Sequence, residues 1–250
     1  MGYDKRFDGR KFTEPRPIQA TAGVIKNANG SALFKIGDTW AYAAVYGPRE
    51  MYPRFLQDPK RGVLRVNYNM MPFSGMGDRV RPGPNRRAKE ISMVSEKALL
   101  SVIDLEKFPN AAVDVYIELP QTDAGSRCAG ICAASIALAD AGIVMKDMVS
   151  AVAVGMVGET PLVDLDYMEE NPDDFEAVDI PVAMVPSTGE VTLLQMDGII
   201  DNDNLKKALD LSQDACKNIA EKQREALVEK YEQEASAASE MDDSSEEESN

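Results

Sequence analysis

The sequence predicts an α+β fold made of two halves, each of which combines strands, a hairpin and covering helices. Two observations lead to this class. Short segments with the apolar pattern of strands gather in residues 18–70 and again in residues 149–196, and longer segments with helical spacing lie between and after them. The strands also follow one another through tight turns instead of alternating regularly with helices, which disfavours a doubly wound parallel sheet.

The first half begins with three strands that should form an antiparallel meander. Turns at residues 27–30 and 37–38 join them, because glycine and short polar residues interrupt the apolar pattern there. A fourth strand ends in a loop rich in proline and glycine, residues 72–85. We expect the four strands at residues 18–26, 31–36, 40–46 and 63–70.

Helical spacing and further strand patterns organise the rest of the chain. Asn85 can cap the first helix through its side chain. We expect helices at residues 85–107, at 127–141 and from 202 into the 220s. We expect strands at residues 112–119, 149–157 and 161–165, and a hairpin of residues 178–185 and 190–196.

The chain is long enough for a substantial core, since 44% of its 250 residues are hydrophobic. We expect one domain over residues 1–230, with halves at about 1–145 and 146–230, and an acidic, flexible tail at 231–250. The first residues are charged and lack the apolar stretch of a signal peptide. The longest apolar stretches are too short to span a bilayer. We therefore expect a cytoplasmic protein without a membrane partner.

Charge is distributed unevenly along the chain. The net charge of −15 argues against a nucleic-acid partner, but residues 231–250 hold eight acidic groups and no basic one, which leaves −7 for the remainder. Residues 54–89 hold nine Lys and Arg against two Asp, whereas residues 159–179 hold nine carboxylates and no cation. These stretches could place anion binding beside metal binding, and ordinary solvated surface would explain them equally well.

The absence of histidine excludes several kinds of site. Ser-His-Asp and Cys-His arrangements, histidine-ligated zinc and paired-histidine ribonuclease chemistry all need that side chain. Cys128 and Cys132 would lie on one face of a helix and could form half of a metal site. Without a second pair, we favour two buried apolar side chains. Any chemistry must therefore use carboxylates, cations, hydroxyls and metal ions.

Residues 121–127 (QTDAGSR) combine several features of an anion site at the predicted start of a helix. A helix N-terminus presents unpaired N–H groups and the positive end of the helix dipole. Gly125 allows close approach of the backbone, Ser126 adds a hydroxyl donor, and Arg127 adds a bidentate guanidinium. The same residues would also fit a helix with Ser126 as its N-cap and Arg127 as a surface charge.

Three cations, Arg86, Arg87 and Lys89, lie in the first turn of another predicted helix. The helix dipole favours acidic side chains there, and a local rule broken in this way often marks a functional site. Arg86 and Arg87 are suited to bind nucleic-acid phosphates. A solvated helix end would also explain them, because each charge costs only roughly a few tenths of a kcal/mol.

Carboxylates gather before the strand predicted at residues 178–185. Asp179 lies at the start of this strand, and Asp173 lies six residues earlier in the approaching loop. Such a pair could converge on one Mg²⁺ ion or supply an acid to a leaving oxygen. Acidic loops are common, however, and on the pattern alone they are more often solvated surface.

Five separated segments resemble, in order, the RNase PH superfamily and within it the active RNase PH-like subunits of archaeal exosomes. They are residues 29–39 (NGSALFKIGDT), 62–68 (GVLRVNY), 86–91 (RRAKEI), 121–127 (QTDAGSR) and 163–167 (VDLDY). The similarity extends from residues 6–10 (RFDGR) to the last predicted helix and omits only the acidic tail. It implies the RNase PH fold, a duplicated β-α-β-α unit like domain 2 of ribosomal protein S5, with mixed sheets and covering helices.

The resemblance also implies roles for individual residues. The matching positions are Gly125, Ser126 and Arg127 for phosphate, Asp173 and Asp179 for catalysis and for Mg²⁺ or Mn²⁺, and Arg86 and Arg87 for RNA. Because Asp174 directly follows Asp173, the first active-site aspartate could be either of the two.

The activity that the resemblance implies is phosphorolysis of RNA in the 3′-to-5′ direction. Inorganic phosphate, the co-substrate, would attack the 3′-terminal phosphodiester and release nucleoside diphosphates, and the reverse reaction would add heteropolymeric tails. The implied partners are single-stranded RNA 3′ ends, an inactive RNase PH-like exosome subunit in an alternating hexameric ring, and RNA-binding cap subunits. Two alternatives stay open: a hydrolytic, metal-dependent 3′ exonuclease that uses the same carboxylates, and a non-catalytic RNase PH-like ring subunit.

Overall fold

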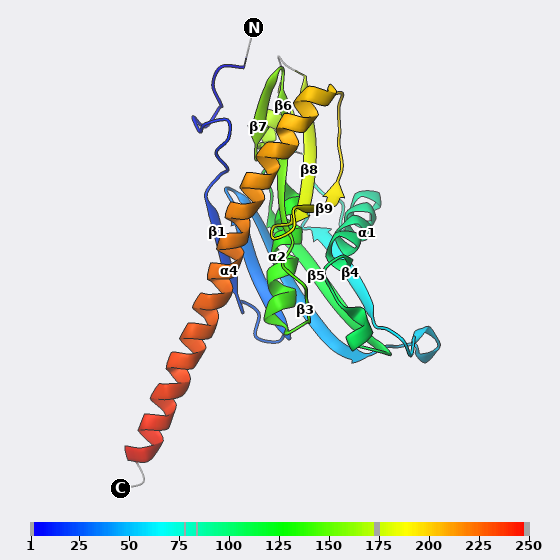
Figure 1. The fold of residues 1–250 in the computed structure, drawn as a ribbon, viewed down its shortest axis with the longest axis vertical. Helices are drawn as coiled ribbons and strands as arrows, with labels where there is room; N and C mark the ends of the chain where they lie inside the picture. The colour runs from blue at the N-terminus through cyan, green and yellow to red at the C-terminus, as the bar shows by residue number, and fades with distance from the viewer. Residues whose placement is uncertain (1–2, 78, 84, 173–175, 248–250) are drawn as a thin grey trace.

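Two β-sheets and the helices that cover them form the body of the protein (Figure 1). The computed structural model describes residues 3–77, 79–83, 85–172 and 176–247, and from residue 238 onwards only the backbone. The first sheet contains both parallel and antiparallel pairs, and helices pack on both sheets. The predicted α+β class is therefore confirmed.

The first sheet has five strands in the order β1-β2-β3-β5-β4. They are β1 (Ile18–Ala22), β2 (Gly30–Ile36), β3 (Thr39–Glu50), β4 (Val63–Met70) and β5 (Ala111–Gln121). β1, β2 and β3 form the predicted antiparallel meander, whereas β4 lies parallel to β5. Ala41, Ala43 and Val45 alternate along β3 and are fully buried, so small side chains let a helix pack closely on this face.

Two helices follow β4 and β5, namely α1 (Arg86–Leu100) and α2 (Ser126–Asp140). The Asn85 side chain caps α1 by accepting a hydrogen bond of 2.7 Å from the Ala88 N–H. α1 ends before the predicted residue 107 because Ile103 pairs with Met145 in an isolated bridge. α2 packs against both sheets and is buried along most of its length. Cys128 and Cys132 are buried in α2 as free thiols.

The second sheet has four antiparallel strands in the order β7-β6-β8-β9. They are β6 (Ser150–Val157), β7 (Thr160–Val163), β8 (Ala177–Val185) and β9 (Glu190–Leu194). Every residue of β6 is buried, because α2 and the last helix both pack on this strand. A one-turn helix, α3 (Tyr167–Glu170), lies between β7 and β8.

The N-terminal segment, residues 3–17, crosses to the second half of the protein. Tyr3 packs in a small apolar cluster with residues of β6 and β7 and with Leu165. Arg6 forms a buried ion pair with Glu169 of α3 at 2.6 Å. The first residues of the chain therefore contact the second sheet, while the division into halves near residue 145 stays a prediction.

The last helix, α4 (Asn202–Glu247), is much longer than predicted. Its first part packs on β6, β7 and β1, and its end projects beyond the body (Figure 1). The prediction that it ends in the 220s was wrong, because the residues that follow are mainly Glu, Ala, Lys and Gln, which are strong helix formers. The flexibility of residues 231–250 stays a prediction. Within the described ranges, no helix combines the length and the apolar character that crossing a membrane requires.

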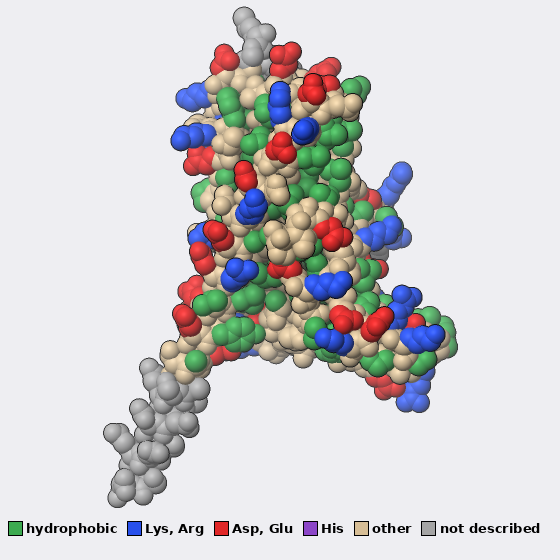
Figure 2. All heavy atoms as spheres, in the orientation of Figure 1, with side chains coloured by type: hydrophobic (Ala, Val, Ile, Leu, Met, Phe, Trp, Pro, Cys, Tyr) green, Lys and Arg blue, Asp and Glu red, His purple; other side chains and the backbone are tan. Residues whose placement is uncertain are grey.

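The cationic stretch of residues 54–89 separates into two groups in space. Arg54, Lys60 and Arg61 are exposed on the turn between β3 and β4, where Figure 2 shows Lys and Arg side chains on a part that projects from the body. Arg81 and Arg87 lie instead at the pocket described below. Only some of the Lys and Arg residues that give residues 54–89 their excess positive charge therefore lie at the candidate site.

Candidate functional site

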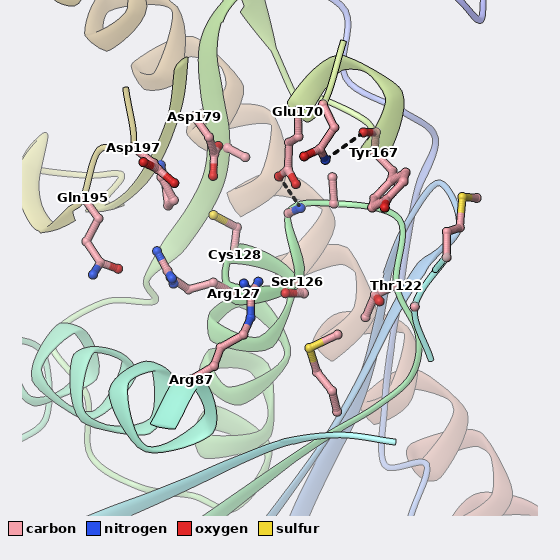
Figure 3. Close-up of a pocket in the computed structure, with 18 of the residues that line it drawn as sticks. Arg87, Thr122, Ser126, Arg127, Cys128, Tyr167, Glu170, Asp179, Gln195 and Asp197 are labelled. Atoms are coloured by element: carbon pink, nitrogen blue, oxygen red, sulfur yellow. Dashed lines mark hydrogen bonds between the residues drawn. The ribbon is translucent and has the colours of Figure 1, made fainter. Parts of the chain in front are cut away.

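A pocket of about 950 Å³ lies at the N-terminus of α2 (Figure 3). Its walls come from β4 and the loop after it, the start of α1, the β5–α2 loop (residues 122–125), the end of α3, β8, and the segment after β9. These segments are far apart in the sequence, so the pocket exists only in the folded chain. The charged side chains in its lining are those of Arg81, Arg87, Arg127, Glu170, Asp179 and Asp197.

The N-terminus of α2 has the geometry of an anion site. Gly125 is the N-cap with a φ of 59°, and no side chain among the described residues caps the helix. The N–H groups of its first turn therefore lack partners within the helix. Ser126, the first helical residue, is buried, and its Oγ accepts a hydrogen bond of 2.9 Å from the Tyr68 hydroxyl. The alternative with Ser126 as the N-cap is wrong, because Gly125 occupies that position.

Two guanidinium groups lie at this end of α2. The Arg127 side chain is 18% exposed and lies 3.5 Å from a Glu90 oxygen, and its buried Nε has no hydrogen-bond partner in the described part of the chain. Arg87 of α1 points into the same pocket (Figure 3). Arg86 is exposed and lies outside the lining that the described residues form. The two arginines predicted to contact RNA therefore differ in position.

Asp179 lies on β8 opposite Gly155 of β6, with its carboxyl group in the pocket. Burial raises the pKa of Asp179 to about 6, the charge of Arg127 opposes this shift, and the charge of Asp197 adds to it. Its Oδ1 is buried and has no hydrogen-bond partner among the residues that the structure describes. Because buried polar atoms are nearly always hydrogen-bonded, this oxygen is available to a ligand.

The predicted partner of Asp179 cannot be located in the same way, because Asp173 and Asp174 lie outside the described residues. Two described carboxyl groups share the pocket with Asp179, namely Asp197 and Glu170, and Glu170 Oε1 accepts a hydrogen bond of 3.5 Å from the Gly125 N–H. Burial raises the pKa of Glu170 to about 7, and the charge of Asp179 contributes to this shift. Glu170 was not among the predicted site residues, although its position in the acidic stretch 159–179 is a signal that could have found it.

Tyr68, Gln195 and Asp197 also contribute polar side chains to the pocket, and no role was predicted for them. Gln195 Nε2 donates a hydrogen bond of 2.8 Å to Glu90 Oε1, and the other oxygen of Glu90 faces Arg127. Gln195 Oε1 is buried without a hydrogen-bond partner in the ranges described. Tyr68 ends the family-like segment 62–68, but no motif marks Gln195 or Asp197, because their contribution depends on where the segment after β9 lies in the fold.

The pocket therefore places opposite charges in one space. Figure 3 shows Arg87 and Arg127 near Ser126, Glu170 beside the N-terminus of α2, and Asp179 and Asp197 on another side of the pocket. An anion held by the guanidinium groups and the N–H groups of α2 would lie beside carboxyl groups that can donate a proton or bind a cation. The structure thus brings the predicted residues 125–127, Arg87 and Asp179 together, while their roles stay predictions.

The described residues contain no group of three or more Cys, Asp or Glu side chains arranged to hold a metal ion. The carboxylate oxygens of Asp179 and Glu170 are nevertheless ligands of the kind that Mg²⁺ and Mn²⁺ prefer, and Mg²⁺ is often held by only one or two carboxylates together with substrate phosphates.

Comparison with known proteins identifies the family. The 3′ exoribonuclease family, domain 1, matches residues 14–144, and domain 2 of the same family matches residues 147–215. The exosome complex component Rrp41 of Methanopyrus kandleri is 50% identical over 226 residues, which cover 90% of this chain and 93% of that protein. Rrp41 of Pyrococcus abyssi is 51% identical over 227 residues, which cover 91% and 90%.

Solved structures agree with these matches. A chain of the Archaeoglobus fulgidus exosome with RNA bound to the active site has a TM-score of 0.73 and 28% identity, covering 88% of this chain and 92% of that chain. Rice Rrp46 has a TM-score of 0.76 at 23% identity, covering 88% and 98%, and this likeness supports the fold alone. The predicted resemblance to RNase PH is confirmed. The chain therefore belongs to the 3′ exoribonuclease family, and both domains of that family follow one another in its sequence.

Proposed function

We infer that this chain is the catalytic subunit of an archaeal exosome and that it shortens RNA from the 3′ end by phosphorolysis. The observation that carries this function is the single pocket in which the N-terminus of α2, with Arg127, lies opposite the carboxyl group of Asp179. The N-terminus of α2 with Arg127 can bind a phosphate, and the Asp179 carboxyl group can donate a proton to a leaving oxygen. Phosphorolysis needs both groups at one phosphodiester. Hydrolysis would use water in place of the phosphate that this anion site can bind, and a purely structural role would need neither the anion site nor the acids.

Inorganic phosphate is the co-substrate and the nucleophile. It is already ionised at neutral pH, so the absence of histidine is no obstacle. The N–H groups of α2, the Ser126 hydroxyl and the Arg127 guanidinium hold it, and Gly125 allows its close approach. One phosphate oxygen attacks the phosphorus of the 3′-terminal phosphodiester, and the bond from this phosphorus to the 3′ oxygen of the preceding nucleotide breaks. The terminal nucleotide leaves as a nucleoside diphosphate.

The departing 3′ oxygen needs a proton, and Asp179 is placed to supply it. With a pKa of about 6, part of the Asp179 population is protonated at neutral pH. Glu170, with a pKa of about 7, can hold a proton at the same pH and can return it to Asp179. Asp173 matches the second essential aspartate of the family and acts with Asp179 in this proposal.

In the alternative to proton donation, Asp179 is ionised and would hold Mg²⁺ or Mn²⁺, with Asp173 as the second ligand. Asp179 fits such an ion because it offers a buried carboxylate oxygen with no hydrogen-bond partner among the described residues. A bound ion would neutralise the negative charge that develops on the departing oxygen.

Single-stranded RNA enters with its 3′ end in the pocket and is held by phosphate contacts. Arg87 lines the pocket and would contact RNA phosphates close to the 3′ end. Arg86 is exposed outside the pocket lining and would contact RNA phosphates farther from the 3′ end. Contacts of this kind do not read base edges, so the enzyme has little sequence preference.

The proposed assembly is an alternating hexameric ring with an inactive RNase PH-like subunit, capped by RNA-binding subunits and located in the cytoplasm. Support comes from the curated relatives, which are named exosome components, and from the likeness to chains of two archaeal exosome structures. We expect the isolated chain to bind RNA weakly and to gain activity when the partner subunit is added.

The function is tested by RNA decay in the reconstituted ring with and without inorganic phosphate, with the products separated by chromatography. We expect decay only with phosphate, and nucleoside diphosphates as products. Monophosphates released without phosphate would establish the hydrolytic alternative. An Asp179→Asn ring that keeps full activity would establish the non-catalytic alternative.

A further inference from the structure

The β5–α2 loop carries backbone strain directly beside the proposed phosphate site. Ala124 and Gly125 both have left-handed φ angles, of 56° and 59°. Alanine rarely adopts this conformation, which persists only where surrounding contacts hold it. Because the loop leads straight into Ser126, its conformation determines where the first N–H groups of α2 point.

Arg16 supplies several of the contacts that hold this loop. Its side chain reaches the loop from the N-terminal segment, and the residue is only 5% exposed. Its Nη1 donates to the backbone carbonyl of Asp123 and, at 3.2 Å, to Asp123 Oδ2. Its Nε and Nη2 donate to the two carboxylate oxygens of Asp164 at 2.8 and 2.7 Å. One planar guanidinium thus joins the loop to the segment that leads into α3.

Asp164, which Arg16 holds, lies in the segment that leads to Glu170 of the pocket. Asp164 also has a left-handed φ, of 57°, and lies shortly before α3, whose last residue is Glu170. Asp123 Oδ1 in turn accepts a hydrogen bond of 3.0 Å from the N–H of Tyr167, the first residue of α3. Arg16 therefore lies between the two backbone segments that place the N-terminus of α2 and Glu170 in one pocket.

Thr39 holds the same loop from the start of β3. Its hydroxyl donates to the Ala124 carbonyl at 2.7 Å and accepts a hydrogen bond of 2.8 Å from the Asp123 N–H. Thr39 is fully buried. Neither Thr39 nor Arg16 belongs to the pocket lining formed by the described residues, so neither is placed to contact a phosphate bound there.

We propose that Arg16 is a positioning residue for the phosphate co-substrate. Its guanidinium holds the β5–α2 loop, and with it the N–H groups of α2 and the Ser126 hydroxyl, at a fixed place relative to the carboxyl group of Glu170. The proposal rests on the proposed function, in which phosphate binds at the N-terminus of α2. Lysine is a poor substitute, because a single ammonium group cannot reproduce a planar fork that spans Asp123 and Asp164.

Arg6 provides a matched control in the same N-terminal segment. It is 1% exposed, and its guanidinium donates to the two carboxylate oxygens of Glu169 at 2.8 and 2.6 Å and to the Asp164 carbonyl at 2.7 Å. Within the described part of the chain it makes no hydrogen bond to residues 122–125. Replacement of Arg6 therefore removes a comparable buried guanidinium without breaking a hydrogen bond to the β5–α2 loop.

The test compares Arg16→Lys, Thr39→Val and Arg6→Lys in the ring reconstituted with the partner subunit. The KM for phosphate, the KM for RNA, kcat and the Tm are measured for each. We expect Arg16→Lys to raise the phosphate KM about tenfold or more and to change the RNA KM by less than about twofold, because a misplaced loop weakens anion binding but leaves the RNA contacts in place. Thr39→Val should raise the phosphate KM in the same direction. Arg6→Lys should lower the Tm with a phosphate KM within about twofold of wild type.

Two results would overturn the proposal. If Arg16→Lys and Arg6→Lys raised the phosphate KM equally, the effect would come from general loosening of the N-terminal segment. If Arg16→Lys failed to assemble, Thr39→Val would decide, and an unchanged phosphate KM in that variant would contradict a positioning role for the loop. The wild-type ring is measured first, because RNA decay that does not depend on phosphate would refute the proposed function itself.

Discussion

Burial and the charge of Asp179 together raise the pKa of Glu170 to about 7. The hydrogen bond from the Gly125 N–H and the charges of Arg87 and Arg16 oppose this shift without cancelling it. The two carboxyl groups come from β8 and from the end of α3. Two acids that share a buried site do not ionise independently. The pair can therefore retain a proton at neutral pH, and a departing 3′ oxygen requires one.

Removal of the acid at position 179 should abolish most of the activity. We expect Asp179→Asn to lower kcat by about 10²–10⁴, the range typical of general acid catalysis, and Glu170→Gln to lower it by about tenfold or more. The measurement is phosphate-dependent RNA decay by the reconstituted ring. Asp197→Asn is the control, since Asp197 also lines the pocket but bonds to Asp179 through its backbone, which the change leaves intact. A larger loss in Asp197→Asn than in Asp179→Asn would assign the acid to position 197.

The raised pKa of Glu170 predicts how stability depends on pH. Its folded-state pKa of about 7 exceeds the ordinary value of 4.5, so the folded chain binds more protons than the unfolded chain between these pH values. The contribution of Glu170 to the free energy of unfolding therefore falls as the pH rises from about 4.5 to 7. Glu170→Gln should be more stable than wild type by about 3 kcal/mol at pH 8 and should match it near pH 4. Urea denaturation at several pH values checks this, and a constant difference between the two proteins would contradict it.

Arg87 and Arg86 should differ in their effect on RNA binding, because only Arg87 lines the pocket formed by the described residues. We expect Arg87→Ala to raise the RNA KM about tenfold, as loss of a charge-assisted phosphate contact would. Arg86→Ala should raise it less than about threefold, and Arg87→Ala should also reduce the dependence of binding on salt. Titration of the ring with a single-stranded RNA at two salt concentrations measures both. Equal effects would place the RNA along the outer side of α1.

The buried ion pair between Arg6 and Glu169 should contribute strongly to the stability of the native state. Both side chains are completely buried, so Glu169→Gln leaves the Arg6 charge without its partner. We expect the free energy of unfolding to fall by about 3–5 kcal/mol. The exposed pair of Lys222 and Glu225 is the control, and Glu225→Gln should cost less than about 1 kcal/mol. Urea denaturation of the two variants gives both values, and similar losses would contradict the argument from burial.

Local patterns predicted most of the secondary structure and one wall of the site. The alternation of Ala41, Ala43 and Val45 and the capping of α1 by Asn85 depend on near neighbours in the chain, so they can be read without the fold. The anion site at residues 125–127 is local for the same reason, since a single strand-to-helix junction contains it. The end of α4 was misjudged because a run of acidic residues was interpreted as disorder although it consists largely of helix formers.

Tertiary structure decided which side chains face this anion site. Glu170 and Gln195 reach the pocket only because α3 and the segment after β9 pack beside α2, and no periodicity in the sequence encodes that packing. Arg16 reaches Asp164 across 148 positions of the chain, and two strained backbone segments depend on this contact. The sequence alone therefore determined the family and the place where phosphate should bind. Beyond the predicted Asp179, the acids that share the pocket and the arginine that holds its loop were decided by the folded core, because contacts between distant segments form only when the sheets close around α2.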